Sequence, residues 1–284
     1  MANEIYLHDH EGFPDLLRIV EEKTGIQAGL IEKDYWIMQA LYGLKKLGLP
    51  FELKGGTSLS KGYHIIDRFS EDIDIYIHPP IEFGINESSN AAVKPKNIEA
   101  KRNFYGWLAQ NIKIDGFIAV ERDTAFDDKD RYRNGGIRLI YPSKTGGVTG
   151  MKEGILLEVG FDDIAPNQPL TISSWAYDEA FQHKELDIID NRAFDVVCYN
   201  PEYSFVEKLQ TIATKYRKEQ SGEGGRPNFM RQYYDVFCLL GNDQVLQFIG
   251  TEAYQARIRK DGFPKPIMIS RQIKTRPFCW MMKI

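Results

Sequence analysis

Residues 53–62, Leu-Lys-Gly-Gly-Thr-Ser-Leu-Ser-Lys-Gly, decide the fold of this chain together with residues 68–75, Arg-Phe-Ser-Glu-Asp-Ile-Asp-Ile. The two adjacent glycines predict a tight turn between a short strand and a helix, and they let a ligand approach the backbone closely. A helix that begins directly after such a turn offers N–H and hydroxyl donors to an anion. We therefore expect the turn to bind the phosphates of a nucleotide. The candidate binding residues are Gly55, Gly56, Thr57, Ser58 and Lys61.

Two carboxylates follow this turn on a predicted strand. Over residues 72–78 the isoleucines alternate with polar residues, so Asp72 and Asp74 share one face of the strand. Mg²⁺ prefers carboxylate oxygen, and two aspartates at i and i+2 can hold a pair of ions about 4 Å apart beside a phosphoryl group. Alone, Asp-x-Asp is more typical of an exposed edge strand, and Gly-Gly-Thr-Ser is more typical of a helix start. Together the two elements indicate transfer of a nucleotidyl group.

These segments resemble the AbiEii/AbiGii toxin-type nucleotidyltransferases of prokaryotic toxin–antitoxin systems. The similarity extends upstream to residues 31–36, Ile-Glu-Lys-Asp-Tyr-Trp, and downstream to residues 207–209, Glu-Lys-Leu, and residues 231–236, Arg-Gln-Tyr-Tyr-Asp-Val. Gln232 departs from the family pattern, which has Asp there. The resemblance implies an α+β, polymerase-beta-like nucleotidyltransferase fold: a mixed sheet with flanking helices, followed by a helical C-terminal part.

The resemblance also implies a reaction and a set of site residues. Family members of known activity transfer nucleotides from an NTP to RNA, typically to the acceptor end of tRNA. By resemblance the ligands would be two Mg²⁺ ions, with Mn²⁺ as an alternative, and an antitoxin of the same system would be a partner. The implied site comprises Thr57 and Ser58 on the phosphates, Asp72 and Asp74 on Mg²⁺, Lys208 on the triphosphate, Arg231 on the nucleotide, and Asp235, which would orient Lys208 or the acceptor.

A third carboxylate is expected on a neighbouring strand of this fold, and Glu158 is the candidate. It lies within the apolar residues 155–161, where a charge needs a partner. A metal site would supply that partner, and an ion pair with Arg138 is the alternative. Asp162 and Asp163 compete with Glu158 for the metal.

Other charged candidates have simpler structural explanations. Lys208 lies beside the apolar stripe of a predicted helix and would otherwise be a surface lysine. Arg231 and Asp235 have the i, i+4 spacing of an ordinary helix ion pair. Lys33 and Asp34 would otherwise be surface charges of the helix that carries them.

Hydrophobic periodicity and turn residues predict the remaining elements. Helices are expected over 29–48, 57–66, 97–112, 201–216, 228–240 and 244–260. Strands are expected over 51–54, 72–78, 116–121, 136–141, 154–161 and 194–199. The composition shifts toward helix near residue 200, so we expect an α/β domain over 1–200 and a helical domain over 201–284.

Composition narrows the functional classes. The 284 residues carry a formal net charge of −4, which argues against non-specific coating of nucleic acid. No apolar run approaches the roughly 20 residues that span a bilayer, and no secretory signal is visible. Three scattered cysteines and five histidines give neither a disulfide framework nor a zinc spacing, so we expect a cytoplasmic protein without membrane contact. The alternatives to an RNA acceptor are transfer to a small-molecule or protein hydroxyl, and a catalytically silent nucleotide-binding fold.

Overall fold

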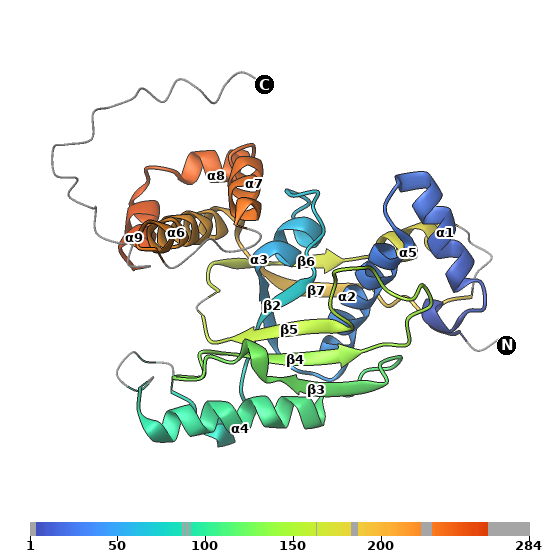
Figure 1. Cartoon of the computed structure of the whole chain (residues 1–284), viewed down its shortest axis with the longest axis horizontal. Coiled ribbons are helices and arrows are strands. Elements are labelled where there is room, and N and C mark those ends of the chain that lie inside the picture. Colours follow the sequence, from blue (N-terminus) through green and yellow to red (C-terminus); the bar gives the residue numbers. More distant parts are fainter. Residues whose placement is uncertain are drawn as a thin grey trace.

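The computed structural model describes residues 4–86, 88, 91, 93–162, 164–182, 187–222 and 229–260. A seven-stranded mixed sheet lies at its centre, in the order β3-β4-β5-β2-β1-β7-β6 (Figure 1). The strands are β1 (Phe51–Lys54), β2 (Asp72–Ile77), β3 (Ala119–Asp123), β4 (Asn134–Ile140), β5 (Ile155–Gly160), β6 (Asn167–Ile172) and β7 (Ala193–Tyr199). The helices are α1 (Phe13–Thr24), α2 (Ala28–Lys46), α3 (Gly55–Thr57), α4 (Pro95–Asn111), α5 (Trp175–Phe181), α6 (Pro201–Gln220), α7 (Met230–Leu239), α8 (Asp243–Phe248) and α9 (Glu252–Lys260). Single helical turns are η1 (Leu7–Asp9), η2 (Ser58–Gly62), η3 (Ile81–Phe83) and η4 (Thr124–Phe126).

The centre of the sheet mixes both strand directions. β2 runs antiparallel to β1 and parallel to β5, and β1 runs parallel to β7. Helices flank the sheet, and α6 to α9 follow it in the chain (Figure 1). The expected α+β class, with a mixed sheet and a helical C-terminal part, is confirmed.

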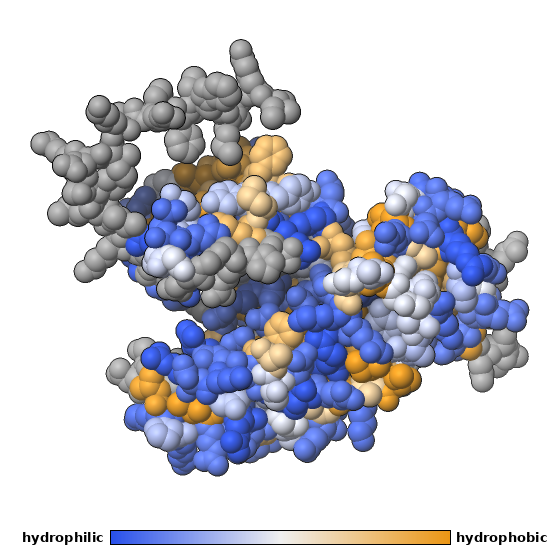
Figure 2. All heavy atoms as spheres, viewed as in Figure 1, coloured by the Kyte–Doolittle hydropathy of each residue, from blue (hydrophilic) through white to orange (hydrophobic). Residues whose placement is uncertain are grey.

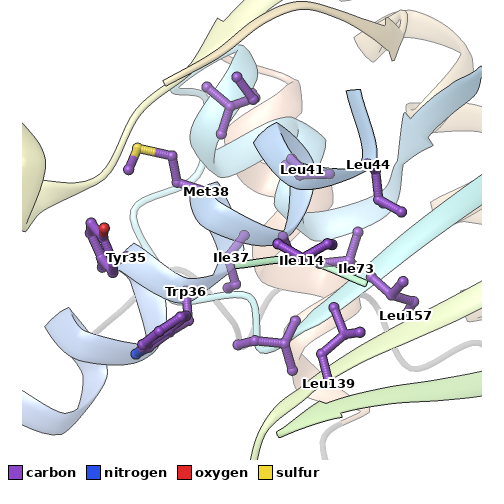
Figure 3. Close-up of a cluster of buried hydrophobic side chains, with 14 of the residues drawn as sticks. Tyr35, Trp36, Ile37, Met38, Leu41, Leu44, Ile73, Ile114, Leu139 and Leu157 are labelled. Atoms are coloured by element: carbon purple, nitrogen blue, oxygen red, sulfur yellow. The ribbon is translucent and has the colours of Figure 1, made fainter. Parts of the chain in front are cut away.

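The main hydrophobic core lies between α2 and the sheet. From Tyr35 to Leu41 every residue of α2 is buried, because the helix is covered on all sides. Figure 3 shows Ile37 of α2 beside Ile114, and Ile73 of β2 beside Leu157 of β5 in the same cluster. The buried isoleucines of β2 therefore fix which face of that strand carries its aspartates.

A second, smaller core joins the C-terminal helices to the segment after the glycine turn. Leu59 and Ile66 pack with Phe205, Val206 and Leu239 of α6 and α7. This core holds α6 and α7 against η2 and the segment that follows it. A boundary at residue 200 stays a prediction, and the helical part does not build its core alone.

Several elements differ from the sequence-based expectation. The predicted helix 57–66 ends at Gly62, and His64 has a positive φ of 53°. The predicted helix 244–260 is two helices, because Gly250 between them has a φ of 87°. The elements α1, β6 and α5 were not predicted. Pro169 argues against a strand in the sequence, but β6 lies at the edge of the sheet, where a proline is tolerated. Across the described ranges, none of the helices combines the length and apolarity needed to cross a bilayer.

Candidate active site

The two aspartates of β2 face the glycine turn. Ile73, Ile75 and Ile77 of β2 are buried, whereas Asp72 and Asp74 are half-buried on the other face. Gly55 has a φ of 73°, and a Cβ atom added to it would lie 1.9 Å from Oδ2 of Asp74. The Asp74 carboxylate therefore contacts the turn so closely that only glycine fits without a shift.

Glu158 is brought beside the aspartates by strand pairing. In the register of the sheet, Asp74 lies opposite Lys54 of β1 on one side and Glu158 of β5 on the other. Glu158 Oε1 accepts a hydrogen bond from Asn134 Nδ2 at 3.3 Å. The predicted alternative, an ion pair with Arg138, is not formed.

The alternative partners and competitors of Glu158 are engaged elsewhere. Arg138 donates from Nε to Asp123 Oδ2 at 2.9 Å, so its charge belongs to the β3–β4 pair. The carboxylate of Asp162 pairs with Lys54 instead of joining Glu158. Asp163 lies outside the described residues.

We call Asp72, Asp74 and Glu158 the acidic cluster, because they lie on the paired strands β2 and β5 and each has a raised pKa. Burial raises the pKa of Glu158 to about 7, and the charges of Asp74 and Asp72 add to the shift. Burial also raises the pKa of Asp72, with Glu71 and Asp74 adding to it. For Asp74, burial raises the pKa although Lys54 and Lys208 oppose the rise. The positive charge near the cluster is therefore too small to offset burial.

The donor set of the acidic cluster fits a hard divalent cation. Three carboxylates on adjacent strands supply the oxygen ligands that Mg²⁺ prefers, and a cation would relieve their repulsion. Within the ranges that the structure describes, no three His, Cys, Asp or Glu side chains converge into a formed metal site. The chemistry of the donors fits Mg²⁺, and this conformation leaves them apart.

The hydroxyl groups after the glycine turn point inward. Thr57 and Ser58 are fully buried, and Thr57 Oγ1 donates to the backbone carbonyl oxygen of Asp72 at 2.6 Å. This differs from the expectation that both hydroxyls contact phosphates. The first N–H groups of the helical turn remain as donors, since such groups lack an intrahelical acceptor.

Lys61 is also directed away from the expected ligand. Its Nζ atom donates to Asp34 Oδ1 at 2.5 Å, and only 2% of the Asp34 side chain is exposed. Lys33 is likewise buried and donates to Glu71 Oε1 at 2.7 Å. The surface-charge alternative for Lys33 and Asp34 is therefore wrong.

A second set of charges lies beside the turn, and we call it the Asp235 network. The Asp235 side chain is fully buried, and its two oxygens accept hydrogen bonds from Arg68 Nε and Nη2, each at 2.7 Å. Lys208 Nζ lies 2.9 Å from Asp235 Oδ2. Burial alone would raise the pKa of Asp235, but Arg68 and Lys208 lower it below its ordinary value.

The network contains one residue that the sequence interpretation missed. Arg68 belongs to the quoted Arg-Phe-Ser-Glu-Asp stretch, and its position just before the aspartates was the available signal. Arg231 is exposed, and the partners of Asp235 come from other segments, so the predicted i, i+4 pair is not what holds Asp235.

A groove of about 510 Å³ continues from this site between the sheet and the C-terminal helices. Its lining includes Lys54, Asp162, Glu207, Gln210 and Arg257. Lys54 lies opposite Asp74 in the sheet, so the groove begins at the acidic cluster. The face in Figure 2 is hollowed beneath the C-terminal helices, and the residues visible around the hollow are mainly hydrophilic.

Three comparisons with known proteins were made, and one of them shows the family of this chain. The solved structure of an antigenic nucleotidyltransferase-like protein from Paracoccidioides brasiliensis is similar at 14% identity and a TM-score of 0.41, over 83% of this chain and 89% of that chain. That similarity is too low to support an argument. A search of curated proteins gave no match. The family model described as "Nucleotidyl transferase AbiEii toxin, Type IV TA system" matches residues 36–277, which include every candidate site residue. The chain therefore belongs to the AbiEii nucleotidyl transferase toxins of type IV toxin–antitoxin systems.

Proposed function

We propose that this nucleotidyl transferase uses Mg²⁺ to move NMP from an NTP to a hydroxyl group of RNA, with release of pyrophosphate and the hydroxyl proton, and that tRNA is the first acceptor to test. The observation behind the proposal is the acidic cluster beside the glycine turn, with Asp74 in contact with Gly55. Its family supports nucleotidyl transfer as the reaction and an antitoxin as a partner.

The proposal assigns a separate role to the glycine turn, to Lys208 with Asp235, and to the acidic cluster. Backbone N–H groups of Gly55 and Gly56 would bind the triphosphate, with Lys208 as the cation beside it. Asp235 holds the Lys208 ammonium in place at 2.9 Å, so we assign Asp235 a positioning role. Mg²⁺ bound to the acidic cluster would neutralise charge on the phosphoryl oxygens and favour ionisation of the acceptor hydroxyl.

Positive charge near Asp72 supports an RNA acceptor. Lys152 is exposed and lies close enough to Asp72 to oppose the rise of its pKa. An exposed lysine there can contact a phosphate of the acceptor strand, and this local contact does not require a basic protein surface. This agrees with a chain whose total charge is negative.

Transfer of label from each of the four NTPs tests the proposal. Wild type and Asp72→Ala are incubated with Mg²⁺ and total tRNA, or with lysate freed of RNA. We expect label in tRNA with wild type and none with Asp72→Ala. Equal labelling by the two proteins would refute the mechanism. Label in protein or small molecules would support the alternative acceptor, and NTP binding without transfer would support the silent fold.

A further inference from the structure

A second pocket, of about 390 Å³, lies beside the glycine turn and away from the groove under α6. We call it the Trp175 pocket. Leu59 of η2 packs into the core shared with α6, whereas Ser60 and Lys61 line the Trp175 pocket. Figure 1 shows α3 between α5 and the C-terminal helices. The helical segment 55–62 therefore separates this pocket from the groove.

One buried carboxylate organises two walls of the Trp175 pocket. Asp34 accepts from Lys61 Nζ through one oxygen and from the Trp175 backbone N–H, at 2.9 Å, through the other. Lys61 Nζ lies 5.1 Å from the centre of the Trp175 ring, and the Phe69 ring centre is 6.3 Å from that ring. Both aromatic side chains are only half-buried. The two aromatic rings therefore present surface to the pocket, and the buried Asp34 carboxylate holds the Trp175 backbone in position.

The charges of the pocket indicate the class of ligand. Its cations are already paired, Lys61 with Asp34 and Arg68 with Asp235, and Asp67 and Asp178 add negative charge to the lining. Among the described residues, the lining therefore offers a phosphate no unpaired lysine or arginine. Aromatic rings with hydroxyl and carboxylate acceptors around them fit a planar, uncharged ring that carries N–H donors, and a nucleobase has this chemistry.

The position of the pocket favours a base from the acceptor. Ser70 lines the pocket two residues before Asp72, and two residues span at most roughly 7 Å. Ser70 Oγ also lies against the turn, 2.5 Å from where a Cβ of Gly56 would be. The residues proposed to bind the triphosphate, Gly55, Gly56 and Lys208, do not line this pocket. A base in the Trp175 pocket would therefore belong to a different nucleotide that reaches Asp72.

We propose that the Trp175 pocket binds an unpaired base of the RNA acceptor next to the hydroxyl that receives the nucleotide. The inference rests on the proposed function for the choice of RNA. The inference also explains the Lys61–Asp34 pair, because this pair holds Trp175 where a base can stack on its ring.

Binding of two RNAs tests the inference without any transfer step. A fluorescein-labelled RNA hairpin with a four-nucleotide single-stranded 3′ end is compared, by anisotropy, with the same hairpin carrying abasic residues in that end. We expect wild type to bind the intact RNA roughly 5- to 150-fold more tightly, the range for stacking of one base on an aromatic side chain. Trp175→Ala should lose this preference and Trp175→Phe should keep most of it. Phe181→Ala, an exposed aromatic on the same helix, is the matched control.

The outcomes separate the inference from the proposed function. If folded Trp175→Ala, checked by circular dichroism and urea unfolding, keeps the wild-type preference, the inference is wrong. It is also wrong if wild type binds both RNAs equally. If wild type transfers no label to tRNA but shows the Trp175-dependent preference, the proposed function fails and the pocket assignment stands.

Discussion

The two groups of carboxylates beside the glycine turn, the acidic cluster and Asp235, have opposite electrostatic environments. In the acidic cluster, burial raises the pKa of all three carboxyl groups, repulsion from Asp74 adds to the rise for Asp72 and Glu158, and the pKa of Glu158 reaches about 7. In the Asp235 network a fully buried carboxylate has a lowered pKa, because Arg68 and Lys208 surround it. Uncompensated charge marks the place where a ligand must bring the missing cation. Compensated charge marks the part that holds the site together.

The contrast predicts opposite responses to pH. The folded-state pKa of Asp235 lies below its ordinary value, so its stabilisation is present above that value and is lost in acid. The folded-state pKa of Glu158 lies above its ordinary value of 4.5, so folding takes up a proton between those two values. Stability from Glu158 therefore falls as pH rises toward 7.

The largest expected effect is on catalysis by the acidic cluster. Asp74→Ala should lower the transfer rate by about 10³-fold or more, because ligation of the proposed ions is worth several kcal/mol at the transition state. Single-turnover transfer of labelled NMP measures it. Glu121→Gln removes an exposed carboxylate of β3 and should leave the rate unchanged. A rate for Asp74→Ala within tenfold of wild type would remove the basis for metal-dependent transfer.

The next effect is on folding through the Asp235 network. Asp235→Asn keeps the shape of the side chain but leaves Arg68 and Lys208 without a counter-charge, with 21% and 14% of their side chains exposed. We expect a loss of roughly 3 kcal/mol in the free energy of unfolding, measured in urea at pH 7. An unchanged midpoint would show that the network does not stabilise the fold.

Glu158→Gln should have the opposite sign. In metal-free protein with EDTA at pH 8, the substitution removes an uncompensated charge and should raise the free energy of unfolding by about 1–3 kcal/mol. Near pH 4.5 the gain should vanish, because the folded protein then carries a protonated Glu158. Urea unfolding at the two pH values measures the difference. A variant less stable than wild type at pH 8 would contradict the raised pKa.

Local sequence patterns were sufficient for the central strands. The alternation around Ile73 and Ile75 predicted which face carries Asp72 and Asp74, because burial of one face fixes the register. Glu158 was a candidate because the fold that the family resemblance implies has a third carboxylate on a neighbouring strand, and the pairing with Asp74 agrees with it. These features depend on residues close together in sequence, or on one apolar run.

The pairs that build the rest of the site depend on distant segments. Arg68 and Asp235 are 167 positions apart, and Asp34 meets Trp175 across 141 positions. No periodicity links such residues, so i, i+4 spacing favoured the wrong partner for Asp235. The same limit applies to Lys61, whose place after the glycines indicated phosphate although its partner is a buried aspartate.

The smallest effect tests how far the Asp235 network extends. Arg231 is exposed, so Arg231→Ala should change the free energy of unfolding by no more than about 0.5 kcal/mol, measured in urea beside Asp235→Asn. If Arg231 binds the nucleotide, as the family resemblance implies, the KM for NTP should rise roughly 3- to 10-fold, as for one hydrogen bond of about 1 kcal/mol. A stability loss as large as that of Asp235→Asn would place Arg231 inside the network. Unchanged stability and an unchanged KM would remove Arg231 from the site, because an exposed arginine that neither holds Asp235 nor meets the NTP has no role in the reaction.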